Sequence, residues 1–145
     1  MKPKLTHIAL HVEDLDACIE FYQNYCHMKI IRRRNQPPNQ VIWLAEFGRE
    51  QEFVLVLLQG GRAQAVFEDN YGHLGFAVAS KQQVDTIAAK AKQQGILVWP
   101  PRQEAYPVGY YCGLLDPNGN FVEFSYGQPL GPGAKSLAPQ GKPLY

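Results

Sequence analysis

Two histidines and one glutamate have the side chains and the placement to form a metal site. His7 opens the stretch Thr6–Val12, and His73 opens the similar stretch Gly72–Val78. Glu123 lies in a third stretch near the end of the chain. Two imidazoles and one carboxylate bind one side of a divalent metal ion and leave its other positions open for a substrate. The residue types therefore predict a metal site made by these three side chains.

The two histidine stretches both alternate in the manner of a β-strand. Residues i and i+2 of a strand point to the same side. His7 therefore shares its side with Ala9 and His11, and His73 shares its side with Gly75 and Ala77. The small residues on these faces leave room for a cavity. The alternative interpretation of either histidine alone is an ordinary core residue with satisfied hydrogen bonds.

Glu123 lies in an apolar stretch, 121–126, that also alternates. Phe121, Glu123 and Ser125 share one side, and the opposite side is entirely apolar or aromatic. A strand of this composition is expected to be covered on both sides. A buried carboxylate is costly unless something neutralises it, and a metal ion beside the two histidines would do so.

The elements that must position these residues repeat along the chain. Helices begin near Asp14 and Ser80, residues that favour the N-cap position. The predicted strands are 6–12, 28–34, 41–47, 53–59, 72–78, 96–99, 109–115 and 121–126. The order predicts an α+β fold of two tandem βαβββ modules that form an eight-stranded cleft. The expected parts are module 1–61, linker 62–71, module 72–127 and a Gly/Pro-rich tail 128–145.

Composition narrows the classes of protein. The chain has 145 residues and a formal net charge of +1, so it gives no reason to expect nucleic acid as a partner. It contains no apolar run near 18 residues and no signal-peptide pattern, so no membrane association is expected. Three cysteines without a C-x-x-C pair are interpreted as reduced thiols. These features predict a cytoplasmic protein.

Residues 5 to about 127 resemble the vicinal oxygen chelate superfamily. Its members include glyoxalases, extradiol ring-cleaving dioxygenases, fosfomycin-resistance thiol transferases, methylmalonyl-CoA epimerases and bleomycin-binding proteins. The resemblance rests on the order and spacing of four motifs. These motifs are Thr6–Leu15, Phe21-Tyr22, Gly72–Val78 and Asp116–Glu123.

The resemblance implies a metal-dependent enzyme acting on a small molecule. Carried over from the family, His7, His73 and Glu123 hold a divalent ion (Fe, Mn, Zn, Ni or Co), and the reaction is that of a dioxygenase, an oxidoreductase, or a lyase or transferase. The family's fourth ligand position falls at Val56 or Leu55, which argues against a glyoxalase. Gln128–Leu130 stand where fosfomycin enzymes are basic, so that activity is not expected. The resemblance also implies a homodimer with sites shared between subunits. The alternative is a metal-free, antibiotic-binding protein of the bleomycin-resistance type.

Further side chains are expected to line the cavity. Trp43, Val56 and Ser125 are the substrate-binding candidates. Tyr110 and Tyr111 are candidate catalytic residues, because a tyrosine hydroxyl can bind a substrate oxygen or donate a proton. Adjacent strand residues face opposite ways, so only one of the two tyrosines can face the cavity. Packing is the alternative role for either.

Overall fold

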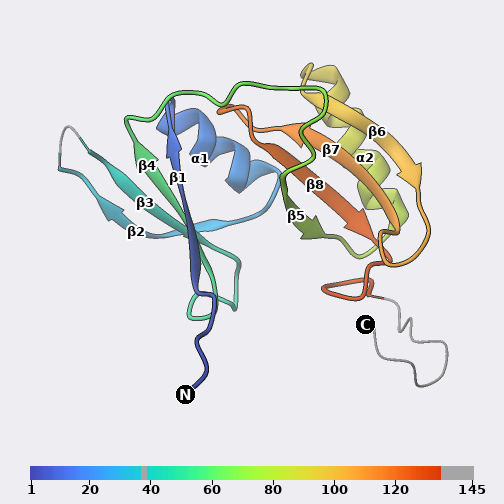
Figure 1. Ribbon diagram of the computed structural model, residues 1–145, viewed down its shortest axis with the longest axis horizontal. Coiled ribbons are helices and arrows are strands. Elements are labelled where there is room, and N and C mark those ends of the chain that lie inside the picture. The colour runs from blue at the N-terminus through green and yellow to red at the C-terminus, as the bar shows by residue number, and fades with distance from the viewer. Residues whose placement is uncertain (37–38, 135–145) are drawn as a thin grey trace. The chain divides into compact units, whose positions relative to one another are not determined.

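The computed structural model describes residues 1–36 and 39–134 (Figure 1), so most of the predicted tail lies outside the described residues. Two compact units form, one from Met1–Val66 with Pro117–Gly119 and the other from Phe67–Asp116 with Asn120 onward. The α+β class with two βαβββ modules is confirmed. The elements are β1 (His7–Val12), α1 (Leu15–Asn24), β2 (Lys29–Arg34), β3 (Val41–Ala45), β4 (Val54–Gln59), β5 (His73–Ala77), α2 (Lys81–Gln93), β6 (Leu97–Gln103), β7 (Tyr110–Leu115) and β8 (Phe121–Tyr126).

The first unit has one sheet in the order β1-β4-β3-β2, and the first pair is parallel. Asp14 caps α1 by accepting a hydrogen bond from the Ala17 amide at 3.0 Å. The apolar stripe of α1 and the inner sides of the strands form a core from which water is excluded. Its fully buried members include Val12, Cys18, Tyr22, Ile42, Leu44 and Leu57. The alternate residues of β1, His7, Ala9 and His11, remain exposed.

The second unit repeats this arrangement with the order β5-β8-β7-β6 and a parallel β5–β8 pair. Ser80 caps α2 by accepting a hydrogen bond from the Gln83 amide. The helix lies along one face of this sheet (Figure 1). Val84 of α2 and Cys112 of β7 meet there, with the thiol donating to the Val84 carbonyl at 3.8 Å. The opposite face carries Glu123, the alternate residue on β8.

Strand β6 is longer than the sequence predicts. Pro100-Pro101 was expected to end it after Trp99, but the strand runs on to Gln103 with register shifts against β7. Proline has no amide hydrogen and is tolerated in a strand that lies at the edge of a sheet. β6 is such an edge, and one of its register shifts against β7 falls between Trp99 and Arg102, where the two prolines lie. The extension brings Arg102 onto the strand.

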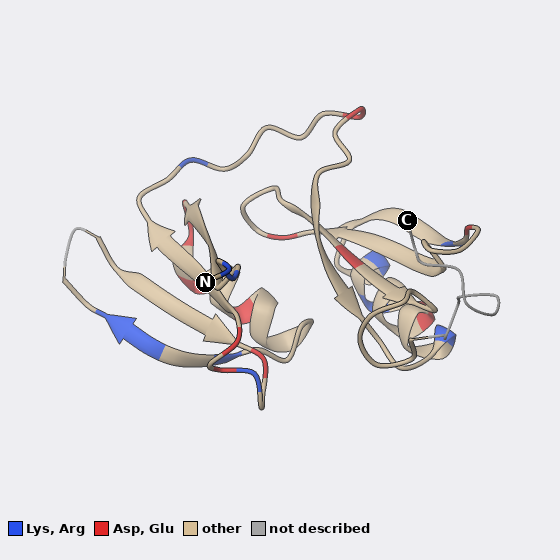
Figure 2. Ribbon diagram, turned by 60° about the horizontal axis from the view of Figure 1, so that its bottom comes forward, with Lys and Arg blue, Asp and Glu red and all other residues tan. Residues whose placement is uncertain are grey.

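Charged side chains are scattered over both units, as Figure 2 shows. The main basic run is Arg32–Arg34 on β2, where all three side chains are exposed. In the described part of the chain, both helices are too short or too polar to serve as membrane-crossing segments.

Candidate metal and substrate site

His73 and Glu123 meet on neighbouring strands of the second sheet. β5 and β8 are parallel partners, with Gly75 opposite Glu123. Nε2 of His73 lies 3.3 Å from Oε2 of Glu123. Glu123 is 6% exposed, while the His73 side chain is 35% exposed. The glycine leaves the space beside the carboxylate open, since a Cβ added at Gly75 would have nothing within 4 Å.

A backbone carbonyl fixes the orientation of the His73 ring. Nδ1 of His73 lies 2.7 Å from the carbonyl oxygen of Tyr71. Since a carbonyl only accepts hydrogen bonds, Nδ1 must carry a proton. In the neutral ring Nε2 then presents a lone pair to the Glu123 carboxylate. Either a proton on Nε2 or a cation has to lie between these two acceptors. A hydrogen bond from the other ring nitrogen to a backbone carbonyl, like the one to Tyr71, is typical of metal-ligating histidines.

Gln128 holds the other oxygen of the carboxylate. Its Nε2 donates to Oε1 of Glu123 at 3.0 Å. Gln128 follows β8 in the segment that the sequence assigned to a tail, and nothing in its spacing indicated this contact. Gly131 packs so closely on Ala77 that an added Cβ would lie 2.6 Å from the alanine Cβ. This contact brings the segment back over the sheet and keeps Gln128 beside Glu123.

The separation of the two donor atoms fits a shared metal ion. Imidazole nitrogen and carboxylate oxygen bind first-row metals at about 2.0–2.2 Å, which places neighbouring donors about 3.0 Å apart in octahedral and about 3.4 Å apart in tetrahedral geometry. The observed 3.3 Å lies within this range. Within residues 1–36 and 39–134, no group of three or more His, Cys, Asp or Glu side chains is arranged to hold a metal. The structure therefore brings together two of the three expected ligands.

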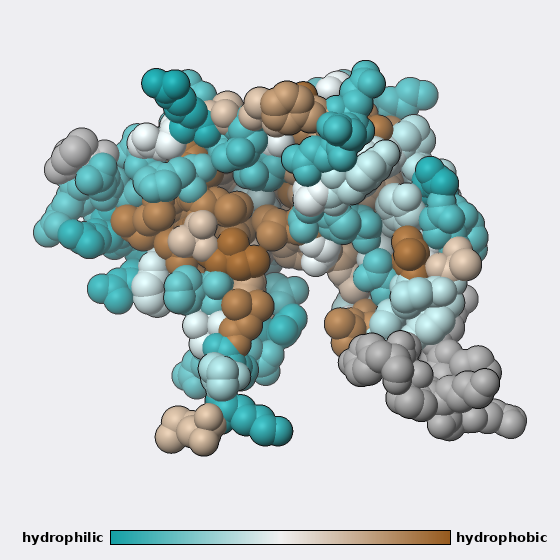
Figure 3. All heavy atoms as spheres, in the orientation of Figure 1, coloured by the Kyte–Doolittle hydropathy of each residue, from teal (hydrophilic) through white to brown (hydrophobic). Residues whose placement is uncertain are grey.

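The remaining sequence candidates of the first unit lie on the sheet face that carries His7. His7 is exposed at the first position of β1, as His73 is at the first position of β5, and its Nδ1 lies 3.0 Å from the Thr6 hydroxyl. Trp43 and Val56 are paired across β3 and β4. The Arg32 guanidinium lies 5.2 Å from the Trp43 ring. Apolar side chains gather over this unit in Figure 3.

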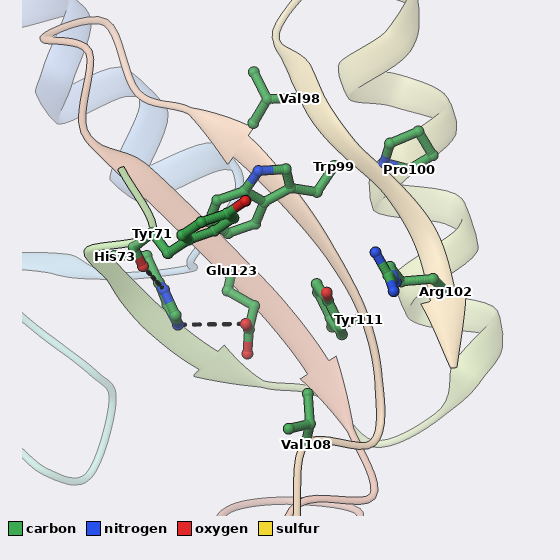
Figure 4. A pocket seen from close by; sticks show the side chains of 9 residues that line it. All are labelled: Tyr71, His73, Val98, Trp99, Pro100, Arg102, Val108, Tyr111 and Glu123. Carbon is green, nitrogen blue, oxygen red and sulfur yellow. Dashed lines mark hydrogen bonds and ion pairs between the residues drawn. The ribbon is translucent and has the colours of Figure 1, made fainter. Parts of the chain in front are cut away.

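A cavity of about 330 Å³ opens beside His73 and Glu123 in the second unit (Figure 4). Its walls come from β5, β6, β7, β8 and the segments before β5 and β7. They are Tyr71, His73, Val98, Trp99, Pro100, Arg102, Val108, Tyr111 and Glu123. Arg102 was not predicted from the sequence, because the path of β6 beyond the prolines was not, and Trp99 was predicted only as part of strand 96–99.

The structure separates the two candidate tyrosines. Tyr111 lines the cavity, whereas the Tyr110 hydroxyl donates to Asp85 on α2 at 2.6 Å. This hydrogen bond is the main reason why the pKa of Tyr110 is raised. Ser125 is 1% exposed and does not line the cavity, and within the described residues its hydroxyl has no hydrogen-bond partner. Of the sequence candidates, the cavity therefore gathers His73, Tyr111 and Glu123.

Residues 4–124 match the model of the Glyoxalase/Bleomycin resistance protein/Dioxygenase superfamily. The chain is 56% identical over 137 residues to the uncharacterized protein PA2024 of Pseudomonas aeruginosa. This alignment covers 94% of this chain and 98% of the relative. It is 29% identical over 130 residues to the uncharacterized protein YwbC of Bacillus subtilis, covering 86% and 98% respectively.

Solved structures show the same fold. A possible glyoxalase from Bacillus cereus is 26% identical, with a TM-score of 0.65 over 83% of this chain and 96% of that one. A mutant of the fosfomycin resistance protein FosX from Listeria monocytogenes, in complex with Mn(II) and 1S,2S-dihydroxypropylphosphonic acid, is 23% identical. Its TM-score is 0.68 over 86% of this chain and 93% of that one.

Proposed function

Because the chain belongs to the Glyoxalase/Bleomycin resistance protein/Dioxygenase superfamily, we propose that it is a divalent-metal-dependent enzyme acting on a small oxygenated molecule. His73 and Glu123 hold the ion from the second unit, and His7 supplies the third ligand. The proposal includes Fe, Mn, Zn, Ni and Co as candidate ions, since imidazole and carboxylate ligands suit each of them. The chemistry is of the dioxygenase or of the lyase and transferase type.

The pairing of His73 with Glu123 supports this proposal most directly. Nε2 of His73 and Oε2 of Glu123 lie 3.3 Å apart, while the far side of each group is already engaged by the Tyr71 carbonyl and by Gln128. A divalent cation satisfies both acceptors at once. When bound, such an ion acts as a Lewis acid toward neighbouring oxygens of the substrate. The Tyr111 hydroxyl, in the same cavity, donates a hydrogen bond to a substrate oxygen.

The third ligand leads us to propose a homodimer with shared sites. Each site would take His7 from one subunit and His73 with Glu123 from the other. The exposure of His7, Ala9 and His11 supports this arrangement, because an open sheet face is available to a second copy. The three cysteines are free thiols, which fits the reducing cytoplasm as the compartment.

Metal titration of wild-type protein and of Glu123→Gln tests the proposed site. Wild-type protein treated with EDTA and then dialysed is expected to bind Mn(II) tightly and to melt at a higher temperature when loaded, because a ligand of the folded state stabilises it. Glu123→Gln keeps the size and loses the anion, so affinity is expected to fall at least tenfold, the scale seen for losses around metal ligands. Glu20→Gln, on the exposed side of α1, is the matched control. Equal metal binding by all three proteins would refute Glu123 as a ligand, and no binding by wild type would leave the metal-free binding protein as the remaining function.

Mixing two defective variants tests the sharing of sites. His7→Ala and Glu123→Gln chains each lack one ligand, and neither is expected to bind metal tightly alone. After exchange of subunits, half of the dimers are mixed and one of their two sites is complete, so about a quarter of the sites recover. If all three ligands came from the same chain, mixing would restore none.

A further inference from the structure

The cavity beside the proposed metal ligands has mainly apolar walls and one positively charged side chain. Its aromatic walls are Tyr71, Trp99 and Tyr111, and Arg102 is the only Lys or Arg among its lining residues. Its volume of about 330 Å³ is roughly twice the ~150 Å³ of an engineered cavity that accommodates benzene. It therefore has room for an aromatic ring with substituents.

Trp99 is held rigidly at the wall. It pairs with Gly113 across β6 and β7, and a Cβ at Gly113 would lie only 2.1 Å from Cε3 of the indole. The indole thus lies directly on the strand backbone. Phe121 stacks on it with a centroid distance of 5.0 Å and an interplanar angle of 13°, and the His73 ring lies in a T-shaped arrangement at a centroid distance of 5.7 Å. These three neighbours fix a half-buried aromatic surface next to a proposed metal ligand.

Arg102 lies at the other side of the cavity. In Figure 4, Arg102 and His73 lie on opposite sides of Glu123, and Tyr111 lies between the carboxylate and the guanidinium. The Arg102 side chain is 62% exposed and one of its terminal nitrogens donates to Glu104. A guanidinium carries five N–H donors and matches the geometry of a carboxylate. Its remaining donors are available to a bound anion.

We propose that this cavity is a subsite for an aromatic or conjugated carboxylate, with the ring against Trp99 and the carboxylate on Arg102. Other oxygens of such a ligand would then face His73 and Glu123, and this part of the proposal rests on the proposed function. The contacts of the ring with Trp99 and of the carboxylate with Arg102 do not depend on the proposed function, because they need no metal. Two residues would then determine the specificity of the subsite, Trp99 for the planar ring and Arg102 for the negative charge.

Calorimetric titration of the metal-free full-length protein tests the subsite. The probes are 2-naphthoate, its neutral counterpart 2-naphthamide, and acetate, which has the charge without the ring. We expect 2-naphthoate to bind about tenfold or more tightly than 2-naphthamide, the scale of a hydrogen bond to a charged group. Acetate is expected to show no saturable binding. Equal affinity for the naphthoate and the amide, or no binding of either, would overturn the proposal.

Two variants change the anion contact in opposite directions. Arg102→Gln is expected to weaken 2-naphthoate to the level of 2-naphthamide without affecting the amide. Glu104→Gln removes the carboxylate that competes for Arg102, so it is expected to strengthen 2-naphthoate binding. Arg34→Gln, an exposed arginine of β2 that also bonds a neighbouring side chain, is the matched control. An unchanged naphthoate affinity in Arg102→Gln would refute the role of this residue.

Replacement of Trp99 separates the ring contact from the charge. Trp99→Leu is expected to weaken 2-naphthoate and 2-naphthamide by the same factor, and Trp99→Phe to recover part of the loss. If both Trp99 variants bound the probes like wild type, the ring contact would be wrong. Metal titration of the same samples keeps the two proposals apart. Naphthoate binding without metal binding would refute the metal site alone, and the reverse would refute the subsite alone.

Discussion

Gln128 and Glu123 are joined by a hydrogen bond of 3.0 Å that leaves only one carboxylate oxygen turned toward His73. The amide donates to Oε1, and Oε2 lies on the histidine side. A carboxylate fixed in this way is prepared to bind a metal through a single oxygen. Gln128 is thus a positioning residue for the proposed site.

Gln128→Leu is expected to lower Mn(II) affinity by about 10–100-fold, the range for residues that orient metal ligands. The leucine keeps the bulk of the side chain but leaves the carboxylate free to rotate. Calorimetric titration measures the affinity, and the EPR spectrum of bound Mn(II) reports any change in its surroundings. Gln82→Leu, on the exposed side of α2, is the control. Unchanged affinity and spectrum in Gln128→Leu would mean that the contact has no part in metal binding.

Gly113→Ala is expected to destabilise the protein by about 1–3 kcal/mol, the usual cost of overpacking. Its Cβ would overlap the Trp99 ring, so the indole would have to leave its place against the strand. Urea unfolding measures the loss, and near-ultraviolet circular dichroism follows the tryptophan. Gly75→Ala is the control, since an added Cβ there meets nothing within 4 Å. Equal stability of the two variants would show that Trp99 is not held as described.

Asn118→Ala is expected to cost about 1–3 kcal/mol, the penalty for leaving buried polar groups unsatisfied. Asn118 is 1% exposed and belongs to the first unit. Its side chain accepts from the Glu13 amide and donates to the His11 carbonyl, each at 3.0 Å. Asn35→Ala, at an exposed position directly after β2, is the control. A melting temperature like that of the control would refute this role.

Cys112 is expected to make the protein less stable in alkali. Burial, followed by the charges of Asp85 and Glu123, raises the pKa of its thiol to about 12 from the ordinary 9.0. Above pH 9 the unfolded chain loses the thiol proton while the native protein keeps it, so this contribution to stability declines between pH 9 and about 12. The pH dependence of unfolding in urea is expected to be shallower in Cys112→Ala than in wild type.

Labelling gives an independent measure of the same thiol. At pH 8, iodoacetamide is expected to spare Cys112 in the native protein, because the reactive thiolate is scarce and the side chain is fully buried. Unfolded protein is the positive control, in which all three cysteines react. Rapid native labelling of Cys112 would contradict its burial and its raised pKa.

Most of the fold was predictable because its signals are local. Alternating apolar residues located the eight strands, and Asp14 and Ser80 marked the helix starts at the positions observed. The end of β6 was predicted wrongly, since Pro100-Pro101 is tolerated in an edge strand at a register shift. Which residues occupy an edge depends on the order of the sheet, which local sequence does not determine.

The candidate site was predictable to a smaller extent. The equivalence of His7 and His73 follows from the internal repeat, and the choice of Glu123 follows from a carboxylate in an apolar strand. The side on which Tyr111 lies depends on its pairing with Ser125 in β7 and β8. Arg102 and Gln128 reach the site through a register shift and a returning segment. Both are long-range features without a sequence periodicity.

The prolines of β6 also influence how copies of this chain can meet. An unprotected edge strand is a template for strand addition by another molecule, which leads to aggregation. Pro100 and Pro101 both lack an amide hydrogen, so the one that faces outward leaves a gap in the donors of this edge, and β6 also has register shifts against its partner. A continuous intermolecular ladder along β6 is therefore blocked. The same residues that carry the strand toward the cavity protect the sheet from edge-to-edge polymerisation.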